Sequence, residues 1–415
     1  MNYLLFFIYL LIFCWLLTKI KFIKDSGIDQ RIIIGLFIIR IAAGVINGYI
    51  NLYHYSGTDA AVFHEQSIAE YHLLFNNPKQ YFTNIFNYNS YQHSGLLDIT
   101  DSFWNNLRSN IVIKLLSIFN IFSNCNYFIN TIFFNFLIFF GSVCFYRIYN
   151  QIFPLHKNLL ILALFLLPSL LYFTAGIQKD GLIFLGLGIC CYNLFFLFKR
   201  ALSLRKIFLS FIGLLIIFLL RNFVLITLIP ALTAWFIAEK NKKYPLQSYI
   251  LVYLFFTIVF FNIGALHPSL NLPQYVSSRQ IAFIEIAKGG GSAININPLF
   301  PNFRSFLNNA PQALNHSLMR PYLTEKFNWL YIPAAFEIFI YELLFVLFLL
   351  FNIRKKFTQP FIYFGIFFSL SMFLMIGYTI PIIGAIARYR SIYLPLVLIP
   401  IICSLNWNKM RISTG

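Results

Sequence analysis

Residues 127–148 read YFINTIFFNFLIFFGSVCFYRI and decide the fold class. Their only charged side chain is Arg147, near the end of the stretch. About 20 consecutive apolar residues in a helix cross the roughly 30 Å hydrocarbon core of a bilayer. The stretch therefore predicts a membrane-spanning helix, and similar runs recur along the chain.

The composition of the whole chain agrees with this interpretation. Of its 415 residues, 59% are hydrophobic, 20% are aromatic and 11% are charged, whereas about 25% are charged in a typical soluble domain. Thirteen acidic and 31 basic residues are too few to cover the surface of a soluble globule of this length. The composition excludes a cytosolic enzyme, a secreted disulfide scaffold and a disordered chain.

The net charge of +18 is concentrated in six short segments between apolar runs. These segments together hold eighteen bases and three acids, and they are residues 19–31, 147–157, 199–206, 239–243, 354–356 and 409–411. Clusters of Lys and Arg in short loops mark the cytoplasmic side of a membrane protein. The basicity therefore predicts topology, and no nucleic-acid partner is expected.

With the basic segments in the cytoplasm, eleven apolar runs alternate sides of the membrane without conflict. They are residues 3–18, 32–52, 127–148, 158–175, 181–198, 207–220, 222–238, 248–265, 332–352, 361–377 and 389–405. We expect an all-α polytopic protein, one integral membrane domain over residues 1–415, with its N-terminus outside and its C-terminus inside. Residues 53–126 and 266–331 are then two long extracytoplasmic loops with interfacial helices.

One apolar run does not fit this alternation. Residues 111–123, IVIKLLSIFNIFS, are too short to cross comfortably and would put the next basic segment on the wrong side. We expect an amphipathic helix in the outer interface, with Lys114 and Asn120 facing water. The alternative is a re-entrant hairpin.

The first candidate for chemistry is Asp59, in the stretch GTDAAVFHE at residues 57–65. Gly57 ends one helix, and Thr58 or Asp59 can cap the next, because Thr and Asp are favoured N-caps. Asp59 is therefore either an N-cap or a catalytic base beside a substrate at the outer leaflet. His64 and Glu65 follow on the same helix as candidate acceptor contacts.

No metal ligand set is evident. Asp59 and Glu70 share a helix face but lie about 16 Å apart at 1.5 Å per residue, so they cannot bind one metal from that helix alone. The sequence requires no cofactor, and a divalent cation at Asp59 is left open.

Basic residues at the outer ends of spans form the second group of candidates. Lys179 and Asp180 lie in TAGIQKDGL, residues 174–182, where they either reach water in a turn or bind a phosphate. Four further arginines at similar depth, or in the second long loop, are candidate phosphate ligands because the guanidinium fork matches phosphate oxygens; they are Arg221, Arg320, Arg388 and Arg390. Their simpler interpretation is contact with membrane lipid phosphates.

The second long loop adds two further features. Gly289–Gly291 offer backbone N–H groups to an anion, although such a run is more often a flexible connector. Arg279 precedes them and is a candidate acceptor contact.

The layout resembles the polyprenyl-phosphate-dependent glycosyltransferases of the GT-C class. The resemblance rests on GTDAAVFHE after an early span, the interfacial run 111–123 and the terminal segment around Arg388–Arg390, and it covers most of the chain in layout. The layout of the chain is also similar to that of Wzy-type polysaccharide polymerases. Departures from the GT-C pattern are the lack of a second acid beside Asp59, an extra first span and no soluble C-terminal domain.

The resemblance implies transfer of a sugar from a polyprenyl-(pyro)phosphate-linked donor to a glycan or lipid acceptor, in bacterial cell-envelope assembly. Asp59 would accept the acceptor proton, and the basic residues would stabilise the departing phosphate. The site would face the extracytoplasmic side of the cytoplasmic membrane. Alternatives are a polymerase or ligase joining lipid-linked repeats, a transporter or lipid flippase without chemistry, and a structural membrane scaffold.

The predicted topology can be tested with reporter fusions. A fusion after Ala201 is expected in the cytoplasm and one after Gly290 outside, because the first follows a basic segment and the second lies in the long loop 266–331. An enzyme reporter that is active on one side only measures this. Signals from the same side would contradict the topology.

Overall fold

The computed structural model describes residues 2–55, 57–86, 103–199, 203–288, 292–325, 331–352 and 359–407. The chain is 85% helical, and within those ranges it has isolated β-bridges but no strand. The all-α fold class is therefore confirmed. The chain packs as two compact units, which are described separately: unit 1 is Met1–Pro154 with Leu164–Asn222, and unit 2 is Leu155–Ala163 with Phe223–Gly415.

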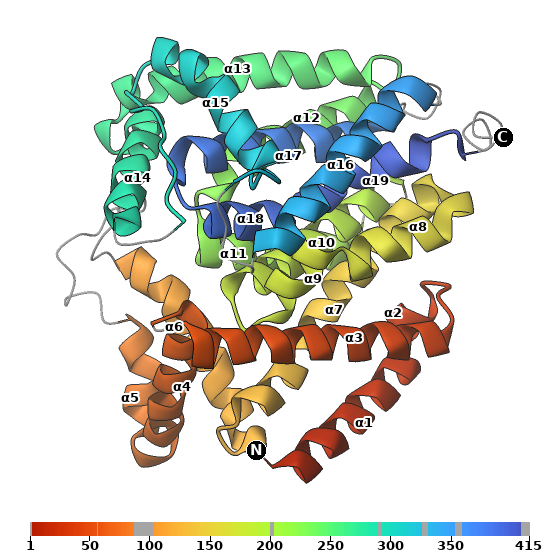
Figure 1. Ribbon diagram of the computed structural model, residues 1–415, viewed down its shortest axis with the longest axis vertical. Helices are drawn as coiled ribbons and strands as arrows, with labels where there is room; N and C mark the ends of the chain where they lie inside the picture. Colours follow the sequence, from red (N-terminus) through yellow and green to blue (C-terminus); the bar gives the residue numbers. More distant parts are fainter. Residues whose placement is uncertain are drawn as a thin grey trace. The chain divides into compact units, whose positions relative to one another are not determined.

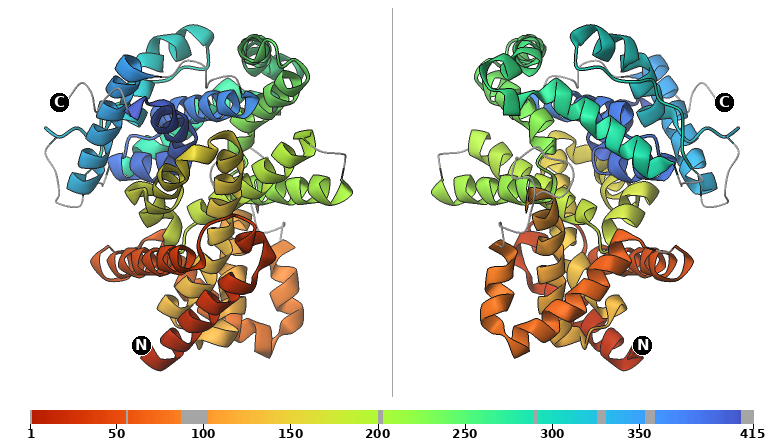
Figure 2. Two further views of the ribbon diagram at one scale, coloured as in Figure 1. Left: turned by 90° about the vertical axis from the view of Figure 1, so that its right-hand side faces the viewer. Right: turned by 90° about the vertical axis from the view of Figure 1, so that its left-hand side faces the viewer.

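Unit 1 begins with two helices that form a V in Figure 1, α1 (Tyr3–Lys19) and α3 (Gln30–Tyr49), joined through the short α2 (Lys21–Lys24). Its other helices are α4 (Asp59–Asn76), α5 (Pro78–Thr83), α6 (Phe103–Ser123), α7 (Tyr127–Ile152), α9 (Pro168–Ala175), α10 (Lys179–Lys199) and α11 (Leu204–Arg221). The helices α4 and α6 pack side by side (Figure 2), and α10 packs against α7 and α11.

Unit 2 is built around α17, which contacts α12, α13, α14, α15 and α19. Its helices are α8 (Lys157–Ile161), α12 (Val224–Lys240), α13 (Pro245–Leu266), α14 (Leu272–Ala287), α15 (Phe303–Met319), α16 (Ile332–Phe351), α17 (Pro360–Thr379), α18 (Ile383–Ser391) and α19 (Leu394–Ser404). The buried side chain of Gln280 in α14 donates to the carbonyl oxygen of Tyr378 (2.7 Å) and accepts from the backbone amide of Leu299 (2.8 Å). The Gln280 side chain thus links the extended segment before α15 to the end of α17.

Six described helices are long and apolar enough to cross a membrane; they are Gln30–His54, Tyr127–Ile152, Lys179–Lys199, Pro245–Leu266, Ile332–Phe351 and Pro360–Thr379. Two further candidates are helix pairs bent at a short break, Pro154–Leu166 with Pro168–Ala175 and Ile383–Ser391 with Leu394–Ser404, and counting each as one span gives eight. Each of the eleven predicted runs overlaps one helix or one bent pair. The count of eleven spans stays a prediction.

The helix predicted at residues 111–123 is longer than expected and packs differently. It begins at Phe103 as α6 and contacts α4, α7 and α11. Lys114 forms an ion pair with Glu70 (2.6 Å), and Asn120 is fully buried, donating to Ser67 (3.1 Å). The expectation that these two side chains face water is therefore wrong, because both satisfy their polar groups inside the helix packing.

The break between α9 and α10 is held by close packing against α3 and α7. A Cβ atom at Gly176 would overlap the side chain of Asn47, so only glycine allows this approach. The Asn47 side chain donates to the Tyr172 carbonyl (3.2 Å), and Asn135 donates to the Ala175 carbonyl (2.7 Å). Backbone carbonyls at the end of α9 are thus satisfied by amides, and the start of α10 has a defined position.

Gly377 provides a test of the packing of unit 2. A Cβ atom at this position in α17 would overlap the backbone carbonyl of Ala313 in α15, whereas Gly35 in α3 has no neighbouring atom within 4 Å. We expect Gly377→Ala to destabilise the protein by about 1–3 kcal/mol, because backbone must shift. Gly35→Ala should be neutral or stabilising by up to about 1 kcal/mol. Thermal unfolding in detergent measures both, and equal midpoints would contradict the packing.

Candidate functional site

A buried ion pair joins the start of α10 to the end of α11 in unit 1. Asp180 is the second residue of α10 and is fully buried, and its Oδ1 lies 2.8 Å from Nη2 of Arg221, the last residue of α11. A buried carboxylate requires a close partner because desolvation of the charge is costly. The sequence singled out both residues, and the structure brings them into contact.

Two further cations lie beside this pair, Arg108 in the first turns of α6 and Lys179 at the start of α10. The Arg108 guanidinium donates to Oδ1 of Asn222 (2.8 Å), the residue after Arg221, and the Lys179 ammonium donates to Ser109 (3.1 Å). We define Arg108, Lys179, Asp180, Arg221 and Asn222 as the cationic cluster. Three bases and one acid give it a formal charge of +2, in a largely buried setting where charge interacts more strongly than in water.

The helix α4 carries Asp59 toward this cluster. Its N-cap is Thr58, whose hydroxyl accepts from the Ala61 amide (3.3 Å), so the capping role belongs to Thr58 and not to Asp59. One turn further, the ring of Phe63 lies 5.3 Å from the Lys179 ammonium. Residues four apart share a helix face about 6 Å from each other, so the exposed Asp59 carboxylate lies on the face of α4 that meets Lys179.

The other two predicted residues on α4 differ in environment. Glu65 is exposed. His64 packs edge-on against the ring of Tyr127, with 5.4 Å between the ring centroids. Burial lowers the pKa of His64 below its ordinary value of 6.5 because desolvation disfavours the charged ring, so His64 is neutral at neutral pH.

The remaining predicted bases belong to unit 2, and Arg390 has a structural role there. It is buried, and its Nη1 donates to the carbonyl oxygens of Ser317 (2.8 Å) and Arg320 (2.9 Å). These carbonyls end α15 and have no partner within the helix. Arg390 therefore stabilises the C-terminus of α15, an environment that its position in the sequence does not reveal.

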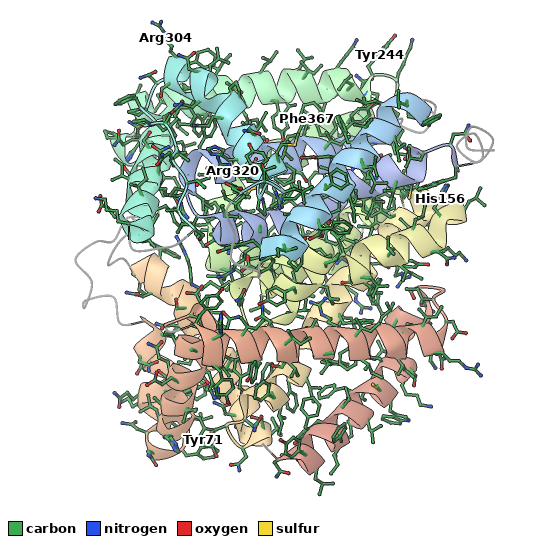
Figure 3. The ribbon with its side chains drawn as sticks, in the orientation of Figure 1. Tyr71, His156, Tyr244, Arg304, Arg320 and Phe367 are labelled. Carbon is green, nitrogen blue, oxygen red and sulfur yellow. The ribbon has the colours of Figure 1, made fainter. Side chains whose placement is uncertain are left out.

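Arg320 itself pairs with an acid. Its Nη1 lies 3.0 Å from Oε1 of Glu325, and Figure 3 shows it at the opposite end of α15 from Arg304, which points outward. Within α15, burial and the nearby positive charge of Arg320 lower the pKa of His316 to about 4. His316 is therefore neutral at neutral pH.

Arg388 and Arg279 both lie beside aromatic rings of unit 2. The guanidinium of Arg388 is 5.7 Å from the ring of Tyr389. Arg279 donates to the Tyr275 hydroxyl (3.0 Å) and lies 4.2 Å from the ring of Phe223. Cation–π contacts of this kind orient a guanidinium without neutralising it.

The predicted site residues thus fall into two groups. Unit 1 gathers Lys179, Asp180 and Arg221 with the start of α4, while the four other arginines lie in unit 2. Gly289–Gly291 are outside the described residues. Arg108 and Asn222 are not among the residues predicted from the sequence. Arg108 lies on the same helix as Lys114, and a helix predicted from residue 103 instead of residue 111 would have included it.

Comparisons with family models, with curated proteins and with solved structures found no match for this chain. Among the residues that the structure describes, no group of three or more His, Cys, Asp or Glu side chains is arranged to hold a metal ion. The fold and the site therefore define the class only: an α-helical protein with membrane-length helices and a buried cationic cluster.

A double-mutant cycle tests the pair at the centre of the cluster. We expect Asp180→Asn or Arg221→Gln alone to destabilise the protein by about 3–5 kcal/mol, because each leaves a buried charge without its partner. The double variant should lose clearly less than the sum of the two single losses. Thermal unfolding in detergent gives the three values. Strict additivity would contradict a coupled pair.

Proposed function

We propose that this chain is a membrane glycosyltransferase that transfers a sugar from a polyprenyl-(pyro)phosphate-linked donor to an acceptor at the extracytoplasmic face. In this proposal the chain crosses the bacterial cytoplasmic membrane eleven times, with its N-terminus outside. Its product is a cell-surface glycan or glycolipid.

The observation that carries the proposal is the cationic cluster of unit 1. A polyprenyl phosphate presents its charge at the membrane surface, and a phosphate is best held by several fixed donors and positive charges. Arg108, Lys179 and Arg221 supply three cations, which contact Asn222, Ser109 and Asp180 where α6 meets the ends of α10 and α11. Asp180 holds Arg221 in place and lowers the net charge, so the cluster favours one anionic group without binding it irreversibly.

Asp59 supplies the base. The acceptor hydroxyl oxygen attacks the anomeric carbon, and the bond from that carbon to the phosphate oxygen breaks. The electron pair leaves with the polyprenyl phosphate, whose growing charge the cluster stabilises, and the hydroxyl proton passes to the Asp59 carboxylate. A divalent cation bound by Asp59 is compatible with this scheme.

Polymerisation or ligation of lipid-linked repeats is the same chemistry with a lipid-linked acceptor. This alternative would rest mainly on arginines of the long loop 266–331, among them Arg279 and Arg320.

The second candidate is a lipid flippase or transporter. It is favoured by the two bent helix pairs, one of them with an angle of 64° between Ile383–Ser391 and Leu394–Ser404, because transporters use discontinuous helices at their substrate sites. Such a protein would move the lipid-linked sugar without breaking its bond to phosphate.

Asp59→Asn tests the proposal. Membranes containing the full chain are supplied with host lipid-linked sugars, and release of free polyprenyl phosphate is measured. We expect release to fall about 10²–10⁴-fold, the usual cost of losing a general base, with expression and melting temperature unchanged because Thr58 keeps the N-cap. The matched control is Asp25→Asn, an exposed acid of unit 1 outside the site, which should retain activity.

Full activity of Asp59→Asn would contradict the role of Asp59. Absence of any release by the wild type, together with movement of lipid-linked sugar across vesicles, would instead establish the flippase.

A further inference from the structure

Several neutral side chains of unit 1 have a buried polar atom with no hydrogen-bond partner in the described structure, and three of these belong to segments that adjoin Lys179 or one another. The three are His64 on α4, Tyr127 at the start of α7 and Gln178 in the break before α10, and the atoms are Nδ1, the hydroxyl oxygen and Oε1. Tyr127 and Gln178 are 3% and 4% exposed. We call these three residues the neutral cluster.

Contacts between neighbouring segments relate the three residues to one another. The rings of His64 and Tyr127 are in edge-to-face contact at 5.4 Å. The Tyr127 hydroxyl lies near the backbone amide of Ile177, without the geometry of a hydrogen bond, and Gln178 is the next residue. Gly48 fixes the tyrosine ring from the far side, since a Cβ atom there would overlap it.

The neutral cluster borders the cationic cluster. Gln178 directly precedes Lys179, and Phe63, the neighbour of His64, lies 5.3 Å from the Lys179 ammonium. A molecule whose charged group is held by Lys179 therefore has its adjacent, uncharged part at the neutral cluster.

Leaving these atoms unsatisfied is costly. Each buried polar group without a partner costs about 1–3 kcal/mol, whereas an apolar isostere at the same position is nearly neutral or stabilising. Nearby Asn47 shows the usual outcome, since its side chain both donates to Tyr172 and accepts from Asn51. Phe, Met and Leu would fill the same space as the neutral cluster if packing were its only purpose.

We propose that the neutral cluster binds the hydroxyl groups of the sugar in a lipid-linked sugar phosphate. A sugar hydroxyl both donates and accepts, so it can donate to Nδ1 of His64 or Oε1 of Gln178 and accept from the Tyr127 hydroxyl. Uncharged groups are suited to this task, and burial keeps the His64 ring neutral. The inference rests on the proposed function, because the phosphate in the cationic cluster places the sugar.

The test combines stability with binding. Tyr127→Phe and Gln178→Met remove the polar atoms and keep the shape, alone and together. The full chain in detergent is melted without ligand, and its affinity is measured for undecaprenyl phosphate and for the same lipid phosphate carrying glucose, mannose, N-acetylglucosamine or arabinose. Tyr53→Phe and Gln66→Met, at exposed positions, are the matched controls.

We expect the wild type to bind at least one sugar-carrying lipid more tightly than undecaprenyl phosphate. Each variant should lose roughly 3- to 10-fold of that preference per hydrogen bond removed, while its melting temperature stays equal or rises and its affinity for undecaprenyl phosphate is unchanged. The controls should change neither quantity.

The inference is overturned if the wild type binds undecaprenyl phosphate but prefers none of the four sugar lipids, or if the variants keep the preference. It is also overturned if they melt at a lower temperature, which assigns the polar atoms to folding. If the wild type does not bind undecaprenyl phosphate at all, that result contradicts the proposed function and not the role of the neutral cluster.

Discussion

The buried pair of Asp180 and Arg221 is the interaction on which the arrangement of unit 1 depends. The acid lies at the N-terminus of α10 and the base at the C-terminus of α11, so each charge also has a favourable interaction with the partial charge of its own helix end. Asn222 follows Arg221 in the chain, so fixing this pair also fixes the acceptor that Arg108 uses. The position of α6 relative to α10 and α11 thus follows from one ion pair and the residue beside it.

From this pair the chemistry of the side chains changes step by step within unit 1. Arg221 pairs with Asp180, and Arg108 and Lys179 belong to neighbouring turns. Lys179 contacts the ring of Phe63, and the next residues along these segments include His64 and Gln178, whose neutral polar atoms have no hydrogen-bond partner, as has that of Tyr127. Asp59 begins the helix that borders both groups. A sugar transfer needs cations for the phosphate, neutral polar groups for the sugar and a base for the incoming hydroxyl. Because unit 1 offers these three kinds of group, we favour sugar transfer over transport.

The sequence predicts the helices well and the partners of polar residues poorly. Long apolar runs such as residues 127–148 predict helices reliably, because a backbone surrounded by lipid must satisfy its own hydrogen bonds and an α-helix does so within one segment. Lys179, Asp180 and Arg221 could be identified as candidates because charges at the ends of apolar runs are rare. The contact between Asp180 and Arg221 joins residues 41 positions apart, and no local pattern encodes it.

The errors have the same origin. Lys114 and Asn120 were expected in water because an amphipathic pattern shows that one face is polar but not what covers that face; here α4 and α7 cover it. Arg390 resembles a phosphate ligand in the sequence, and the pattern does not reveal that its Nη1 donates to the carbonyls that end α15. Arg108 was missed because the start of α6 lies beyond the apolar run that signalled it.

The central claim, that the cationic cluster holds a lipid-linked phosphate, is tested most directly by native mass spectrometry of the full chain with undecaprenyl phosphate. The account predicts that wild type and Lys79→Gln, which removes an exposed lysine, bind one lipid phosphate, and that Arg108→Gln and Lys179→Gln lose most of it. Equal occupancy in all four proteins would contradict the claim.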